Sequence, residues 1–302
     1  MNEFTSGFWS AYIAIITAAS IIACGVLLWR LSTKRLAPGH KADVMGHVWD
    51  ETLEEYNNPL PRWWMWLFWI TLAFGVAYLL LYPGLGSFAG VLKWSSTGQY
   101  EREQVRAKER YEPIFVKYAA MDIPAVAADG QAREMGQRMF LNYCAQCHAS
   151  DARGGRGFPD LTDDDWLYGG DPPAIVATIQ QGRSGIMPPW PQLGEEGIRN
   201  VTHYVLQMGG RTHDTLKAAQ GQALYAANCA ACHGADGKGN QALGAPNLTD
   251  DIWLYGGGET SIVETISKGR NGQMPAWGEF LGANKTHLLA AYVYGLSKPA
   301  AR

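Results

Sequence analysis

The sequence predicts an all-α protein that begins with two membrane-spanning helices and continues into two copies of one small helical domain. Two observations support this prediction. Residues 1–82 contain two apolar runs without a charged side chain, and residues 131–298 contain an internal duplication. Each copy carries one C-x-x-C-H motif and closes with an apolar stretch that has helical spacing.

The two apolar runs are long enough to cross a bilayer, which takes about 20 apolar residues. Phe8 to Trp29 gives 22 residues and Trp63 to Tyr82 gives 20. Basic residues follow the first run where a signal peptide would have a cleavage site, so we expect this helix to be retained. Aromatic residues at both ends of the second run are typical of membrane interfaces. A buried core helix fits two such runs less well.

The duplication divides the rest of the chain. A connector at 83–130 leads to a first domain at 131–212 and a second at 213–302. Both copies contain, in the same order, a Gly-x-x-x-aromatic-x-x-x-Cys start, a Pro-x-Leu stretch, a Trp-Leu-Tyr-Gly-Gly stretch and a Gly-Arg-x-Gly-x-Met-Pro loop. The second copy has two extra residues in a Gly-rich loop between His233 and Pro246. Such limited drift indicates two copies of one fold.

The C-x-x-C-H motif is the attachment signature of c-type haem. It occurs at 144–148 and again at 229–233. Thiols at i and i+3 lie on one helix face and can bond the two vinyl groups of a haem, while the adjacent imidazole reaches the iron. The sequence therefore predicts two haem c groups, with the attaching and ligating residues Cys144, Cys147, His148, Cys229, Cys232 and His233.

Met187 and Met274 are the candidates for the second axial ligand of each iron. A methionine often only fills a gap in a core. These two, however, occupy the same place in the duplicated Gly-Arg-x-Gly-x-Met-Pro loop, which favours ligation. His/Met ligation raises the reduction potential and suits electron transfer. It also closes the sixth position to oxygen or substrate.

Matched prolines, arginines and tryptophans of the two copies are further candidates near the haems: Pro159, Pro246, Arg183, Arg270, Trp166 and Trp253. A ligating histidine usually donates its other ring N–H to a carbonyl, which the prolines can supply. The arginines either pair with haem propionates or lie in solvent. The tryptophans either wall the haem or pack in an ordinary core.

Other uses of the cysteines fit less well. Zinc binding and a redox disulfide require neither the following histidine nor the distant methionine. Cys24, inside the first apolar run, is interpreted as a small hydrophobic residue. With 25 basic and 28 acidic side chains, the composition gives no indication of nucleic-acid binding.

The orientation follows from basic residues and from the haem motifs. Residues 1–7 carry no Lys or Arg, whereas the loop 30–62 carries Arg30, Lys34, Arg35, Lys41 and Arg62. The positive-inside rule places this loop in the cytoplasm and both termini outside. The segment after Tyr82 is also partly basic. Haem is attached to c-type cytochromes outside the cytoplasm. We therefore expect the haem domains to lie in the periplasm.

The duplicated domains resemble class I cytochrome c in their Gly-x-x-x-[Phe/Tyr]-x-x-x-C-x-x-C-H start, Pro-x-Leu stretch, Met-Pro loop and aromatic C-terminal helix. Residues 47–64, HVWDETLEEYNNPLPRWW, resemble the N-terminal signature of the dihaem subunit, subunit III, of cbb3-type cytochrome c oxidases. Together the two resemblances cover nearly the whole chain.

The resemblance implies a role and a place. Such subunits lie in the bacterial inner membrane with their haem domains in the periplasm. They take electrons from a donor cytochrome c and pass them to the monohaem cytochrome subunit and the haem-copper catalytic subunit. The chain alone is then not an enzyme.

Two other functions compete with this one. The chain could serve another periplasmic-facing membrane redox enzyme, which would have no reason to carry residues 47–62. It could also be a haem sensor, which would need an open sixth position.

Overall fold

The computed structural model describes residues 6–32 and 36–297. Lys34 and Arg35, which contribute to the orientation prediction, lie outside this range. The chain divides into two compact units, Met1–Lys108 and Glu109–Arg302, and each is described by itself.

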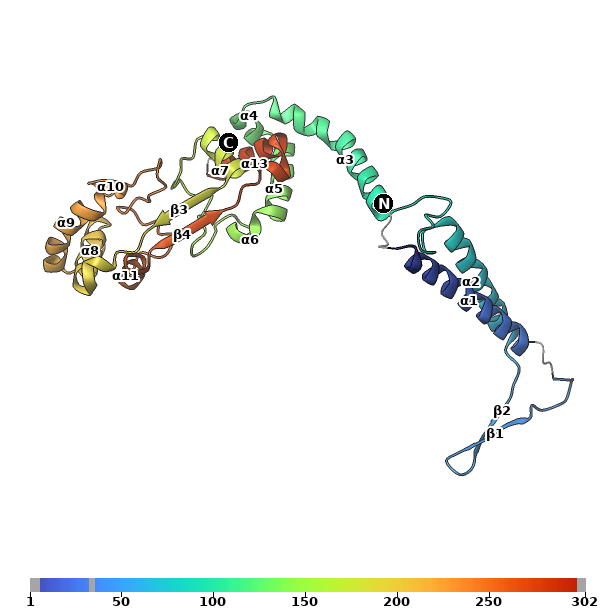
Figure 1. Cartoon of the computed structure of the whole chain (residues 1–302). Coiled ribbons are helices and arrows are strands. Elements are labelled where there is room, and N and C mark those ends of the chain that lie inside the picture. The colour runs from blue at the N-terminus through green and yellow to red at the C-terminus, as the bar shows by residue number, and fades with distance from the viewer. Residues whose placement is uncertain (1–5, 33–35, 298–302) are drawn as a thin grey trace. The chain divides into compact units, whose positions relative to one another are not determined.

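The chain is mostly helical, as the sequence predicts, and Figure 1 labels its elements. The N-terminal elements are α1 (Gly7–Ser32), β1 (Val44–Trp49), β2 (Leu53–Tyr56), α2 (Arg62–Leu81) and α3 (Ser96–Ala119). Helix α4 (Ile123–Ala128) lies at the end of the connector. The first repeat contains α5 (Gly130–Tyr143), α6 (Ala145–His148), α7 (Pro172–Gln181), β3 (Arg183–Met187), the 3-10 helix η1 (Pro191–Leu193) and α8 (Gly194–Met208). The second contains α9 (Thr215–Asn228), α10 (Ala230–His233), α11 (Glu259–Lys268), β4 (Arg270–Met274), α12 (Gly278–Leu281) and α13 (Ala283–Ser297).

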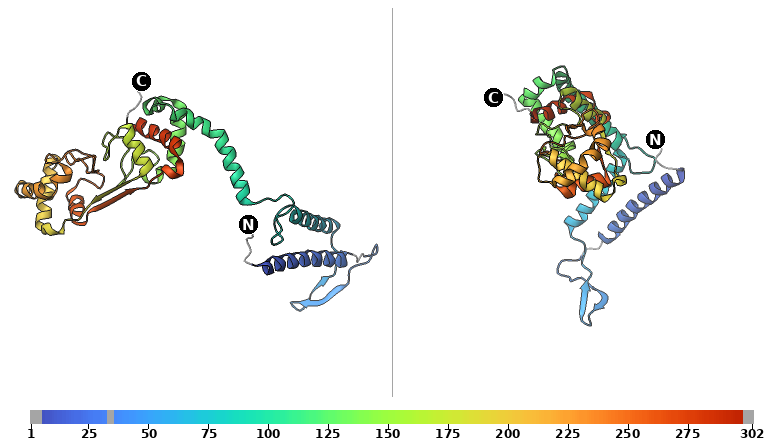
Figure 2. Two further views of the ribbon diagram at one scale, coloured as in Figure 1. Left: turned by 45° about the horizontal axis from the view of Figure 1, so that its top comes forward. Right: turned by 90° about the vertical axis from the view of Figure 1, so that its left-hand side faces the viewer.

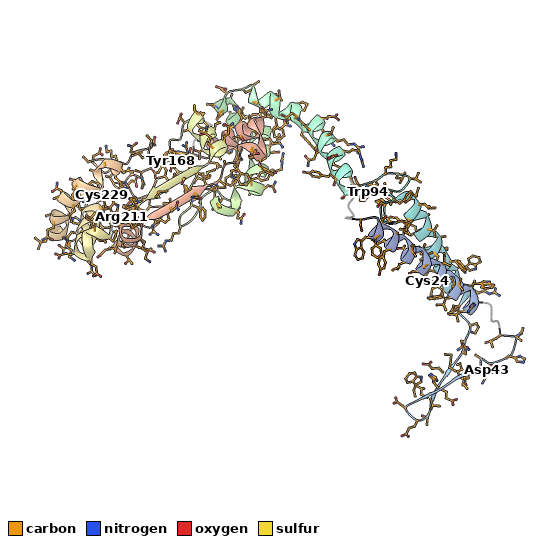
Figure 3. The ribbon with its side chains drawn as sticks, in the orientation of Figure 1. Cys24, Asp43, Trp94, Tyr168, Arg211 and Cys229 are labelled. Atoms are coloured by element: carbon orange, nitrogen blue, oxygen red, sulfur yellow. The ribbon has the colours of Figure 1, made fainter. Side chains whose placement is uncertain are left out.

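Helices α1 and α2 coincide with the two predicted apolar spans and pack against each other. Trp69 of α2 lies 3.8 Å from the position that a Cβ on Gly25 would take, and the Ser87 amide donates to Ser10 Oγ at 2.7 Å. Leu28 is the one buried residue of α1, and α2 has none; Cys24 is exposed (Figure 3). Both helices are long and apolar enough to cross a membrane, which would cover these surfaces.

The loop between α1 and α2 contains a β-hairpin that the sequence analysis did not predict. Strands β1 and β2 pair in antiparallel fashion, with Trp49 opposite Leu53. Asp50 and Glu51, at the turn, both have positive φ, 47° and 70°. Three residues, 50–52, separate the paired Trp49 and Leu53, and positive φ is a conformation that residues other than glycine rarely adopt. The usual Asn-Gly or Asp-Gly signal is missing here, so the turn is hard to recognise from the sequence.

The C-terminal unit contains two helix bundles, each around its own hydrophobic core (Figure 1). Helices α4, α5, α7, α12 and α13 form the first bundle. Helices α8, α9 and α11, with η1, form the second bundle. Phe140 and Leu288 are fully buried in the first core, and Tyr225 and Val201 are 2% and 1% exposed in the second.

The two repeats exchange their C-terminal helices. Helix α13 follows the second motif in sequence but packs on α4, α5 and α7, while α8 follows the first motif and packs on α9. A Cβ on Gly136 would lie 2.5 Å from Tyr292 Cβ, and one on Gly221 would lie 2.0 Å from the Asn200 carbonyl oxygen. The division at 212/213 therefore separates two repeats in sequence, and each bundle takes helices from both of them.

Strands β3 and β4 connect the bundles as a two-stranded antiparallel ribbon (Figure 2). Strand β3 leads from the first bundle to the second, and strand β4 leads from the second bundle back to the first. Its five pairs are Arg183↔Met274, Ser184↔Gln273, Gly185↔Gly272, Ile186↔Asn271 and Met187↔Arg270. The register is symmetric about the central glycine pair, as expected when two copies of one sequence pair with each other.

Loops of the two repeats also meet. The Gly157 amide donates to the Leu254 carbonyl at 2.8 Å, and the Gln241 side-chain amide donates to the Trp166 carbonyl at 3.0 Å. Asp165 of the first repeat lies near Asp250 of the second. Burial, together with repulsion from Asp250 and Asp163, raises the pKa of Asp165 to about 6.

Gly136→Ala tests the crossing of α5 and α13. The added methyl has no room against Tyr292, so we expect a loss of about 1–3 kcal/mol in the free energy of unfolding. The matched control is Gly130→Ala at the start of the same helix, where nothing lies within 4 Å of the new Cβ. Equal thermal stability of the two variants, followed by circular dichroism, would contradict the close crossing.

Asp165→Asn tests the acidic contact. A carboxyl whose pKa is raised by folding destabilises the fold as it ionises, so the cost is absent below the ordinary value of 3.8, grows as the pH rises toward 6 and is complete well above it. At pH 7 we expect the free energy of unfolding of the variant to exceed that of the parent by on the order of 1 kcal/mol after solvent screening, with a higher melting temperature. At about pH 3 the two chains should melt at the same temperature. A gain that is the same at both pH values would show that the Asp165 charge is not responsible.

Candidate haem sites

Both C-x-x-C-H motifs form a single helical turn directly after a longer helix. Cys144 ends α5 and begins α6, and Cys229 ends α9 and begins α10 in the same way. The second cysteines, Cys147 and Cys232, are exposed, and all four thiols are free. Burial raises the pKa of the Cys144 and Cys229 thiols to about 11, so these thiols are protonated at neutral pH.

The imidazole of each motif is buried and oriented by one hydrogen bond. His148 Nδ1 lies 3.1 Å from the Pro159 carbonyl oxygen, and His233 Nδ1 lies 3.1 Å from that of Pro246. A ring nitrogen beside a carbonyl must carry the proton and donate it, which leaves Nε2 with a free lone pair. Burial also lowers the pKa of both histidines, which favours the neutral ring that metal ligation needs.

The structure brings each motif together with the methionine of the other repeat. Met274 packs against the first core, and so does Cys144. Met187 packs against the second core, and so does Cys229. Sequence order would pair each motif with the methionine that follows it. The crossing of β3 and β4 reverses that pairing, because each strand carries its methionine into the opposite bundle.

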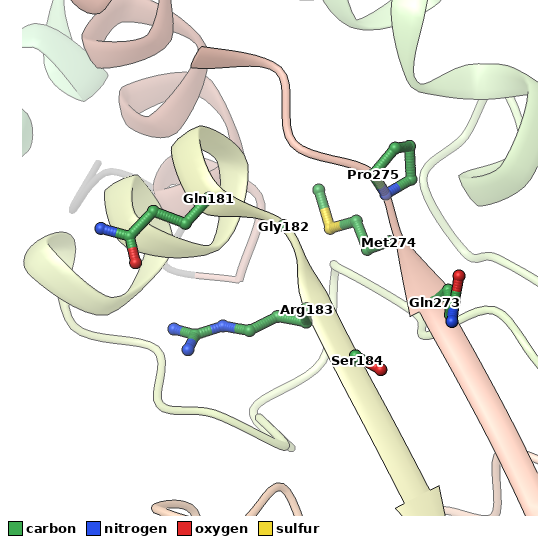
Figure 4. A pocket seen from close by; sticks show the side chains of 7 residues that line it. All are labelled: Gln181, Gly182, Arg183, Ser184, Gln273, Met274 and Pro275. Atoms are coloured by element: carbon green, nitrogen blue, oxygen red, sulfur yellow. The ribbon is translucent and has the colours of Figure 1, made fainter. Parts of the chain in front are cut away.

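The two arginines, in contrast, remain beside their own repeat. Arg183 Nε donates to Thr178 Oγ1 at 2.9 Å, and its guanidinium lies 4.6 Å from the centre of the Tyr168 ring. Arg270 Nε donates to Thr265 Oγ1 at 3.0 Å. Its guanidinium lies over the Tyr255 ring at 4.5 Å. A pocket of about 320 Å³ is lined by Arg183 and Met274, together with their neighbours on both strands (Figure 4).

The two tryptophans have different surroundings. Trp166 is half-buried against the first core. Trp253 packs against the second core and donates its indole N–H to the Asp250 carbonyl at 2.8 Å. The guanidinium of Arg211 lies 5.3 Å from the Trp253 ring centre (Figure 3 labels Arg211). Sequence reasoning assigned no role to Tyr168 or Arg211, although Tyr168 belongs to a duplicated stretch.

The residues of each of the two sites fit a covalently attached haem. Each site offers two free thiols one helical turn apart, a buried imidazole with Nε2 available and a thioether in the same core. Among residues 6–32 and 36–297, no group of three or more His, Cys, Asp or Glu side chains is arranged to hold a metal ion directly. The thiols, imidazole and thioether of each site form a donor set that suits haem iron.

Comparison with known families gives matches over most of the chain. Residues 41–89 match the N-terminal domain of cytochrome oxidase-cbb3, FixP. Residues 131–205 and 216–293 match cytochrome c oxidase, cbb3-type, subunit III. The first match covers the hairpin and α2, and the two parts of the second coincide with the two repeats.

Curated relatives agree with these matches. The cbb3-type cytochrome c oxidase subunit CcoP of Rubrivivax gelatinosus is 47% identical over 300 residues, 99% of this chain and 98% of that protein. Subunit CcoP of Cereibacter sphaeroides is 39% identical over 271 residues, 83% of this chain and 93% of that protein. Subunit FixP of Azorhizobium caulinodans is 39% identical over 269 residues, 83% and 92% of the two chains. The chain thus belongs to the family of cytochrome c subunits, subunit III, of cbb3-type cytochrome c oxidases.

Proposed function

We propose that this chain is a membrane-anchored dihaem electron relay. It takes electrons from a periplasmic donor cytochrome c and passes them to the monohaem and haem-copper subunits of a cbb3-type oxidase. The observation that carries the proposal is that each core joins one C-x-x-C-H motif to one methionine. Haem c, when bound, supplies a one-electron ferric/ferrous couple.

The ligand sets that we propose cross between the repeats. His148 and Met274 would hold one iron, and His233 and Met187 would hold the other. Pro159 and Pro246 orient the two imidazoles through the Nδ1 contacts. The thioethers of Met187 and Met274 would hold the irons and would keep oxygen and small substrates away from them. Oxygen reduction then belongs to a partner subunit, and the chain alone is not an enzyme.

The ribbon keeps the two sites close to each other. Strand β3 has five residues and runs from Arg183, opposite Met274, to Met187. The two methionine positions are therefore separated by about 13 Å of extended strand. A short and rigid connection of this kind supports electron exchange between the two centres within one unit.

The membrane placement completes the proposal. Helices α1 and α2 span the bacterial inner membrane, the hairpin loop lies in the cytoplasm and the haem bundles lie in the periplasm. The length and composition of both helices support this placement, as does the attachment of c-type haem outside the cytoplasm. The match of residues 41–89 and the names of the relatives favour a cbb3-type oxidase over another membrane redox enzyme.

Purification of the native complex tests the partner assignment. We expect the chain, extracted from its own membrane with mild detergent, to co-purify with a monohaem cytochrome and a haem-copper subunit. Mass spectrometry identifies these companions. Recovery with a dehydrogenase and without any haem-copper subunit would contradict the proposed complex.

Methionine replacement tests the crossed ligation. In a chain that carries Cys144→Ala and Cys147→Ala, only the second motif can attach haem. We expect Met187→Ala in this chain to open the sixth position, so that the reduced haem binds carbon monoxide. Met274→Ala, the matched control, should leave the spectrum of that haem unchanged. The opposite result would show that each motif uses the methionine that follows it in sequence.

A further inference from the structure

The two sites are nearly equivalent, but their charges differ. Helices α7 and α11 occupy the same place in the two repeats, and each presents a threonine to the arginine of the following strand. Directly before that threonine stands Ala177 in α7 and Glu264 in α11. Both positions are half-buried. Among the residues that the structure describes, a carboxylate therefore lies within ion-pair distance of Arg270 but not of Arg183.

Glu264 makes its most protected ion pair with Arg270. Glu264 Oε2 lies 3.3 Å from Arg270 Nη2, and the two side chains are 34% and 19% exposed. Two other cations reach the same carboxylate, Arg156 at 2.9 Å and Lys268 at 3.6 Å, but their side chains are 65% and 74% exposed. Because solvent and salt screen exposed charges strongly, the Arg270–Glu264 pair is the least screened of these three ion pairs.

Arg183, the equivalent of Arg270, has only neutral partners. Its guanidinium donates to Thr178 Oγ1 at 2.9 Å and to the Ala174 carbonyl at 3.5 Å, and it lies over the Tyr168 ring. Within residues 6–32 and 36–297, no carboxylate lies within ion-pair distance of Arg183. The guanidinium charge of Arg183 therefore has no ion-pair partner among these residues, and Arg183 lines the same pocket as Met274 (Figure 4).

We propose that Glu264 makes the haem held by His233 and Met187 the lower-potential centre of the pair, by cancelling the charge of Arg270. A nearby cation stabilises the reduced iron because reduction adds a negative charge. Arg183 keeps this effect at the first centre, whereas Glu264 removes it at the second. The inference depends on the proposed relay function and deepens it.

The charge difference gives the relay a direction. An electron that enters at the second centre moves downhill to the first, which holds it more tightly. The donor cytochrome is then oxidised at the second bundle, and the next subunit of the complex is reduced from the first bundle. Arg270 also lowers the pKa of Glu264, so the carboxylate carries its charge at neutral pH.

Potentiometric titration of the intact dihaem chain tests the inference without assigning either haem in advance. In Glu264→Gln we expect the equilibrium constant for reduction of the lower-potential haem to increase about tenfold. This corresponds to a rise of about 59 mV in its reduction potential for one electron. The matched variant Ala177→Glu places a carboxylate beside Arg183 and should lower the higher potential by a similar factor. Both variants should therefore reduce the difference between the two reduction potentials, Glu264→Gln by raising the lower one and Ala177→Glu by lowering the higher one.

Two controls separate the charge effect from other causes. Glu196→Gln removes an exposed charge from α8 of the same bundle and should leave both potentials in place. Arg156→Ala breaks the contact between the first repeat and α11 but keeps the Arg270–Glu264 pair, so it should not raise either potential. If Arg156→Ala raises the lower potential as much as Glu264→Gln does, the inter-repeat contact is responsible and the inference is wrong.

The remaining outcomes are equally informative. If Glu264→Gln raises the higher potential, or shifts neither, the inference fails while the relay function stands. If the parent chain attaches no haem, or if its haems bind carbon monoxide readily, the relay function fails first.

Discussion

The exchange of C-terminal segments through the β3–β4 ribbon is the constraint on which the rest of the C-terminal unit depends. Each strand begins beside one bundle and delivers its Met-Pro loop and final helix to the other. Each core contains a helix of the other repeat. Tyr292 of the second repeat packs closely on Gly136, and the backbone of Asn200 of the first repeat packs closely on Gly221. Two copies of a small domain have thereby become one folding unit. The ribbon also keeps the two candidate haem sites at a short separation.

Much of the site could be predicted from residues alone. The motif spacing, the proline after each motif and the paired Met-Pro loops are local patterns, and a duplicated local pattern strongly restricts what its residues can do. The hydrogen bonds from His148 and His233 to the proline carbonyls follow from such a pattern. The two apolar runs likewise predict α1 and α2, because helix length and composition are properties of one segment.

The pairing of motifs with methionines could not be predicted in this way. A helix with the composition of α13 fits against α5 or α9 equally well on sequence grounds, because the repeats are so similar. Only the packed structure shows which helix lies against which glycine. The hairpin was missed for a different reason: Asp50 and Glu51 take up a turn conformation that glycine or asparagine normally occupies. Glu264 was missed because the sequence shows only that the two repeats differ at this position. The ion pair with Arg270, which gives the difference its consequence, is visible only in the structure.

The most direct test of the exchange is an experimental structure of the haem-loaded chain, with the two irons located by their anomalous scattering. The account predicts that the iron held by His148 has the sulfur of Met274 as its opposite ligand, and that the iron held by His233 has the sulfur of Met187. A structure in which His148 and Met187 share one iron would contradict it.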